Sequence, residues 1–147
     1  MGIISRFPAG ATEPYTEEIY NSDGQFIDVK MYGYETIRAY AFYNCFDLAL
    51  TTLPSGITNI GDYAFYYCAS LALTTLPSGI TNIGGGAFAE CTSLVSLTFE
   101  GTPENIGAGA FAGCNNLTTI NVPWAEGAVA NAPWGAENAT INYGYTG

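Results

Sequence analysis

Four cysteines at a constant spacing are the residues of this sequence that most directly suggest chemistry. They recur every 23 positions, at Cys45, Cys68, Cys91 and Cys114. If each holds the same place in a stacked repeat, neighbouring cysteines form a row about 4.8 Å apart. One zinc ion needs four ligands around a single point, so a row excludes shared coordination by all four. Neighbouring cysteines are within disulfide reach, but their apolar surroundings favour a structural ladder of free, buried thiols.

Carboxylates are the second candidate, because two of them about 5–9 Å apart across a sugar site can hydrolyse a glycosidic bond. Acidic residues gather at Glu13, Glu17 and Glu18, and again at Glu100 and Glu104. None recurs with the cysteine spacing, and the sequence has no Asp-x-Asp-x-Asp calcium loop. We expect these acids to solvate the surface. A carboxylate-based glycan hydrolase is the less favoured alternative.

The composition excludes several classes of function. The 147 residues include no histidine, so the chain has no Ser-His-Asp triad and no histidine-ligated metal. Three basic residues against 13 acidic ones give a net charge of −10, which argues against nucleic-acid binding. No stretch reaches the ~18 apolar residues of a membrane helix, and no signal peptide is recognisable at the start. We therefore expect no enzyme activity, no cofactor, no metal and no membrane insertion.

The cysteine spacing is one part of a repeat that organises the whole chain. Residues 37–59 and 60–82 are identical at 18 of 23 positions. Four further residue types recur with the same period: Ile37, Ile60, Ile83 and Ile106; Ala41, Ala64, Ala87 and Ala110; Phe42, Phe65, Phe88 and Phe111; Leu48, Leu71, Leu94 and Leu117. A repeat of this length with fixed apolar positions predicts a leucine-rich α/β solenoid. We expect these positions to point inward as ladders.

Each repeat predicts one strand and one short helical turn. The strands are expected on one face, after each leucine, at residues 51–53, 74–76, 97–99 and 120–122, and the helical turns on the other, at residues 40–45 and their copies. The domain divides into an N-terminal flexible arm, a β-hairpin cap, four repeats and a C-terminal cap that holds Trp124 and Trp134, at residues 1–14, 15–36, 37–122 and 123–147. We name the repeats coils 1 to 4, beginning at residues 37, 60, 83 and 106.

Two surfaces are candidates for binding. Tyrosines repeat on the turns of coils 1 and 2, at Tyr40, Tyr43, Tyr63, Tyr66 and Tyr67, and Phe46 lies beside them. A tyrosine cluster offers a large contact area with a polar tip, although these rings could also simply pack on one another. The second surface is the strand face, where we expect a ladder of small polar side chains: Thr52, Thr75, Thr98 and Asn121.

The repeat also carries a family resemblance. The motif Ile-Gly-x-x-Ala-Phe-x-x-Cys-x-x-Leu, seen at residues 60–71, resembles the BspA-like class of bacterial leucine-rich repeats, and coil 1 departs from it at Arg38. The tail resembles the ending of small repeat proteins from gut bacteria and their prophages. The resemblance implies an extracellular, cell-surface or virion-associated module that adheres to a surface protein or glycan. It implies no catalytic residues, and a structural spacer in a larger complex is the alternative.

Overall fold

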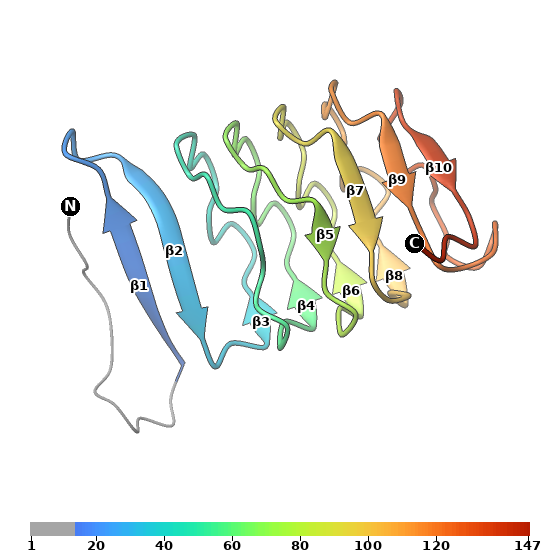
Figure 1. Cartoon of the computed structure of the whole chain (residues 1–147), viewed down its shortest axis with the longest axis horizontal. Coiled ribbons are helices and arrows are strands. Elements are labelled where there is room, and N and C mark those ends of the chain that lie inside the picture. The colour runs from blue at the N-terminus through green and yellow to red at the C-terminus, as the bar shows by residue number, and fades with distance from the viewer. Residues whose placement is uncertain (1–13) are drawn as a thin grey trace.

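The structure is a computed structural model that describes residues 14–147 (Figure 1). The coils follow one another along the long axis, from a hairpin at one end to the C-terminal strand at the other (Figure 1). The flexible arm predicted for residues 1–14 lies, apart from Pro14, outside the described residues.

All regular elements of the described residues are strands. They are β1 (Tyr15–Tyr20), β2 (Phe26–Tyr32), β3 (Thr36–Ile37), β4 (Asn59–Ile60), β5 (Thr75–Leu76), β6 (Asn82–Ile83), β7 (Ser96–Phe99), β8 (Asn105–Ile106), β9 (Thr119–Asn121) and β10 (Thr140–Asn142). The strands β1 and β2 pair antiparallel as a hairpin, and the others form two parallel sheets.

The two parallel sheets follow the repeat. One sheet has the order β10-β9-β7-β5 and contains the predicted strands of coils 2, 3 and 4. The predicted strand of coil 1 at residues 51–53 is extended but pairs with no neighbour. The other sheet, β3-β4-β6-β8, was not predicted, and its short strands pair each repeated isoleucine with the isoleucine of the next coil. The fold is a leucine-rich repeat β-solenoid with parallel strands on two sides.

The prediction of short helical turns is wrong, because the described residues contain no helix. Residues 40–45 and their copies form successive tight turns in which Tyr40 and Asn44 have left-handed backbones, with φ of 62° and 60°. Their N–H groups donate to the next coil instead of along their own segment: Tyr40 to the Asp62 carbonyl at 3.0 Å, and Asn44 to the Tyr66 carbonyl at 2.8 Å. A left-handed residue in each turn breaks the helical path and aims these donors sideways.

The core is a set of side-chain ladders along the axis. The phenylalanine rings stack in register, with centroids 5.3 Å apart between Phe65 and Phe88 and 5.5 Å apart between Phe88 and Phe111. The repeated isoleucines and leucines are also buried in every coil. Since each coil contributes one rung, every ladder is completed only by its neighbours.

The N-terminal end is covered on one side only, so the expected cap does not close it. The Ala49 N–H donates to the Ile27 carbonyl of β2 at 2.8 Å, and Phe26 stacks on Phe42 at 6.3 Å. No strand pairs with the outer edge of β3 among the described residues. As a result Ala41 is exposed and Phe42 is only half-buried, whereas the equivalent residues of coils 2 to 4 are buried.

Residues 123–147 cover the C-terminal end more completely. The strand β10 pairs with β9, and the Phe111 N–H donates to the Trp134 carbonyl at 2.8 Å. Trp134 is fully buried and its indole packs against Trp124, with ring centroids 6.0 Å apart. The side-chain amide of Asn131 donates to the Ile106 carbonyl at 3.2 Å, so the outer edge of β8 has a partner that β3 lacks.

Candidate binding surfaces

Six aromatic side chains form one cluster on the turns of coils 1 and 2, which we call the tyrosine patch. Two rows run along the axis: Tyr40 stacks on Tyr63 with centroids 5.4 Å apart, and Tyr43 stacks on Tyr66 at 5.1 Å. Contacts of 5.5–5.7 Å join the rows and add the last two rings, so the patch consists of Tyr40, Tyr43, Phe46, Tyr63, Tyr66 and Tyr67. All five tyrosines predicted to form a surface therefore lie together.

The patch is open to solvent. Tyr40 is 56% exposed, Phe46 is 49% exposed and Tyr63 is 39% exposed, while Tyr66 is half-buried between its neighbours. Partial burial and the adjacent Tyr43 raise the pKa of Tyr66 above that of a free phenol. The Tyr66 hydroxyl is therefore protonated at neutral pH, and it can both donate and accept a hydrogen bond.

Three members of the patch have unusual backbones. Tyr40, Tyr63 and Tyr67 have φ of 62°, 56° and 61°, in the left-handed region that favours glycine. Two later coils carry glycine at these positions, Gly86 with φ of 65° and Gly113 with φ of 73°. A left-handed backbone disfavours a non-glycine residue by about 1–2 kcal/mol. Coils 1 and 2 therefore carry bulky rings where glycine would be the less strained residue.

The patch ends abruptly at coil 3. The positions of Tyr40 and Tyr43 become Gly86 and Ala89 in coil 3, and glycine and alanine again in coil 4. The ring of Tyr63 lies over Gly86, where a Cβ atom would come within 2.4 Å of it. A tyrosine in coil 3 could therefore not continue the row without a local rearrangement.

The threonine face does not form the expected continuous surface. Thr52 is exposed and belongs to no strand, whereas Thr75 and Thr98 are half-buried in β5 and β7. The amide of Asn121 is buried and donates to the Thr98 hydroxyl at 3.0 Å, and Asn142 donates to the Asn121 carbonyl oxygen at 2.8 Å. This row is an internal hydrogen-bond ladder, so fewer of its polar groups are free for a partner.

A second ladder of amides, which the sequence analysis missed, lies beside the isoleucines. Asn82 donates to Asn59 at 2.7 Å, and Asn105 donates to Asn82 at 2.8 Å, in each case from Nδ2 to Oδ1. The signal was present in the sequence, because these asparagines recur with the same period as the cysteines. The ladder stabilises the sheet of β4, β6 and β8 and ends at Thr36 of β3, which has no side-chain amide.

The four cysteines are free thiols in one row, and the last three are buried. Each of these three donates to the carbonyl of a phenylalanine in the preceding coil, as Cys68 does to Phe42 at 3.1 Å. Burial raises the pKa of Cys68 to about 12 and that of Cys114 to about 11, and it also raises the pKa of Cys91. Protonated thiols are poor nucleophiles and poor metal ligands, so the row contributes packing.

The predicted carboxylate groups form no evident site. Glu13 lies outside the described residues, and Glu17 and Glu18 are successive residues of β1, so their side chains point to opposite faces. Glu100 and Glu104 are both exposed. Within residues 14–147, no three acidic or cysteine side chains gather in a way that could hold a metal ion.

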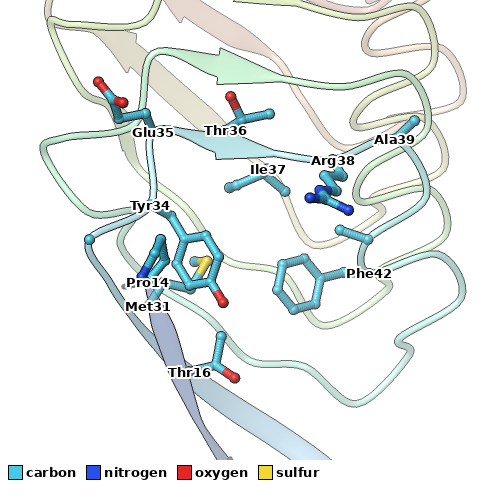
Figure 2. A pocket seen from close by; sticks show the side chains of 12 residues that line it. Pro14, Thr16, Met31, Tyr34, Glu35, Thr36, Ile37, Arg38, Ala39 and Phe42 are labelled. Carbon is cyan, nitrogen blue, oxygen red and sulfur yellow. The ribbon is translucent and has the colours of Figure 1, made fainter. Parts of the chain in front are cut away.

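A groove at the N-terminal end contains residues that the sequence analysis assigned no function. It has a volume of about 680 Å³ and lies between the hairpin and β3 (Figure 2). Tyr34, Ile37, Arg38 and Phe42 point into the same space in Figure 2. The only sequence signal was Arg38 itself, which stands where the other coils have glycine.

Comparisons with known proteins agree with this architecture. Residues 20–128 match the family model described as the BspA type leucine rich repeat region, in six copies. The crystal structure of a leucine-rich repeat protein from Bacteroides ovatus ATCC 8483 is similar, with a TM-score of 0.70 and 31% sequence identity. The similarity covers 84% of this chain and 31% of that protein, so the chain spans about a third of its length. No curated protein matches the chain. The part of the chain that the structure describes includes no helix able to span a membrane.

Proposed function

The chain belongs to the BspA-type leucine-rich repeat family, and from that membership we propose a non-enzymatic binding module whose tyrosine patch contacts a partner protein. The family supports a protein-binding role in general. The finer assignment to the patch rests on its exposure, its composition and its backbone. We further propose that the module acts at a bacterial surface or on a phage particle, and that residues 123–147 serve as its C-terminal cap.

The observation that carries this proposal is the left-handed backbone at three exposed tyrosines. If the rings served only to cover the turns, glycine or alanine would do so without strain, as in coils 3 and 4. Residues held in sparsely populated backbone regions are concentrated at binding and catalytic sites. Exposed, strained and clustered tyrosines therefore favour recognition over packing.

The chemistry of the patch suits a protein surface. Tyrosine is enriched among the residues that dominate binding energy at protein interfaces, because its ring buries a large area and its hydroxyl forms hydrogen bonds. None of the six patch members carries a charge at neutral pH, so their burial requires no ion to lose its water. The patch thus matches an apolar partner surface with hydrogen-bonding groups at its rim.

The test is a paired array of purified cell-surface proteins and glycans. It compares the wild-type chain with the combined variant Tyr40→Ser, Tyr43→Ser, Tyr63→Ser and Tyr67→Ser. The matched control is Tyr145→Ser, which removes a 38% exposed tyrosine outside the patch. We expect at least one protein ligand that the control retains and that the combined variant binds at least ~10-fold more weakly.

Equal binding by the combined variant and the wild type would refute the patch as the contact surface. A ligand that is only a glycan, and is lost in the combined variant, would keep the surface and change the class of partner. Thermal unfolding of every variant shows that the chain is folded in the assay.

A further inference from the structure

We propose that the open edge of β3 is a second binding site, which takes an extended segment of a partner protein as an added parallel strand. The segment would carry an apolar residue over Ile37 and an acidic residue beside Arg38. This site is separate from the tyrosine patch, and it extends the interface by which the coils already stack on one another.

The backbone of coil 1 presents hydrogen-bonding groups to this site. In a parallel ladder, alternate residues direct their backbone groups to opposite neighbours. The Ile37 carbonyl accepts from the Gly61 N–H of coil 2 at 2.8 Å, so Thr36 and Arg38 face away from coil 2. Within residues 14–147 neither of these two N–H groups has an acceptor. An unpaired strand edge of this kind is a template for strand addition.

The register of the inner coils defines how a segment would bind. At the next junctions, the Asn82 N–H donates to the Thr58 carbonyl at 3.3 Å and the Gly84 N–H donates to the Ile60 carbonyl at 2.8 Å. Thr36 and Arg38 occupy the positions of these two donors in coil 1. A segment with the sequence of residues 57–64 would therefore accept both free N–H groups. Its own tyrosine N–H would donate to the Ala39 carbonyl, as Tyr63 donates to Gly85 at 3.0 Å.

Arg38 gives the site its charge preference. Gly84 of coil 3 lies so close to coil 2 that a Cβ atom there would meet the carboxylate oxygen of Asp62 at 2.4 Å. Arg38 is the residue of coil 1 at this same position, and it can carry a side chain because no coil packs before it. Its guanidinium has no ion-pair partner among the described residues. An aspartate in the added segment, placed as Asp62 is in coil 2, would lie next to it.

The groove also limits the length of the segment. Its volume of about 680 Å³ lies within the usual range of binding clefts. Phe26 of β2 already takes the next place in the phenylalanine stack, 6.3 Å from Phe42. A bound segment therefore ends before its own phenylalanine, which is why the probe stops at the alanine equivalent to Ala64.

The experiment uses the full-length, 15N-labelled chain and an acetylated, amidated peptide with the sequence of residues 57–64. Amide hydrogen exchange is measured with and without saturating peptide. We expect exchange of the Thr36 and Arg38 amides to slow at least ~10-fold, while the amide of Gly127 at the other end is unchanged. The same peptide with an N-methylated tyrosine is the matched control. It loses the donor to Ala39, and we expect it to bind several-fold more weakly.

A second pair of variants tests the role of Arg38. The peptide change Asp62→Asn should weaken binding to the wild-type chain about threefold and leave binding to the Arg38→Gln variant unchanged. Arg38 is exposed, so the substitution leaves the core intact. Unchanged exchange at Thr36 and Arg38, or equal binding of the N-methylated peptide, would overturn the proposal. Slow exchange of these amides without peptide would overturn it as well, because the chain itself would then fill the site.

Discussion

Coils 1 and 2 differ from coils 3 and 4 in what they add to the same repeat. All four use one frame of isoleucine, alanine, phenylalanine, cysteine and leucine. The first two carry exposed aromatic rings on left-handed turns, and the groove lies at their end of the molecule. The last two carry glycine and alanine on the turns and continue into a C-terminal end with two buried indoles. The difference teaches that stability is concentrated at the C-terminal end and recognition at the N-terminal end.

The largest expected effect compares the two ends of the core. Trp134→Ala removes a fully buried indole whose Nε1 donates to the Ala130 carbonyl at 2.8 Å, and we expect it to lower the free energy of unfolding by about 3–5 kcal/mol. Phe26→Ala removes a half-buried ring and should cost about 1–2 kcal/mol. Urea unfolding followed by tryptophan or tyrosine fluorescence measures both. Equal losses would mean that the two ends are equally well packed.

The buried thiols of coils 2 to 4 give a prediction about alkaline pH. Their pKa values are raised in the folded chain, so folding keeps protons that the unfolded chain releases above about pH 8.5. Stability is therefore fully present below that pH and falls as the pH rises toward about 11–12. We expect a loss of about 1–2 kcal/mol per buried thiol between pH 8 and pH 10. The slope should be smaller in Cys91→Ala, and an identical slope would refute the assignment to the thiols.

The amide ladder predicts a smaller contrast along the chain. Asn82 takes part in two side-chain hydrogen bonds, whereas Asn59 takes part in one because β3 has a threonine at this position. We expect Asn82→Ala to cost about 1–2 kcal/mol and Asn59→Ala about half as much. Unfolding by urea at neutral pH measures the difference. A larger loss for Asn59 would contradict a ladder that ends at coil 2.

Much of the frame was predictable from the sequence, because a constant repeat period fixes which residues share a rung. The ladders of Phe65, Phe88 and Phe111 follow directly from that spacing, as do the strands at Thr75 and Thr98. The family followed from the motif at residues 60–71.

Other features could not be predicted, for physical reasons that can be named. Two-residue strands such as β4 leave no alternation of polar and apolar residues, so the second sheet had no periodic signal. The helical prediction for the turns fails because tyrosine gives no sign of a left-handed backbone, which only coordinates reveal. The groove depends on which edge the hairpin covers. The sequence indicates the hairpin at its Asp-Gly turn, but not the side of coil 1 on which it packs.

The central claim is that the tyrosines of coils 1 and 2 are present for recognition and not for stability. It is tested most directly by the free energy of unfolding of the double variant Tyr40→Gly and Tyr63→Gly. Glycine relieves about 1–2 kcal/mol at each left-handed position, while the loss of one exposed ring pair costs about 0.5–1.5 kcal/mol.

The control is Tyr43→Ala, which removes a stacked ring from a turn position without a left-handed backbone. It should lower the free energy of unfolding by about 1 kcal/mol. In the same urea titration, we expect the glycine double variant to be as stable as the wild type or more stable. A loss of more than about 2 kcal/mol in the double variant, beyond what one exposed ring pair contributes, would show that the rings hold the coils together and would contradict the account.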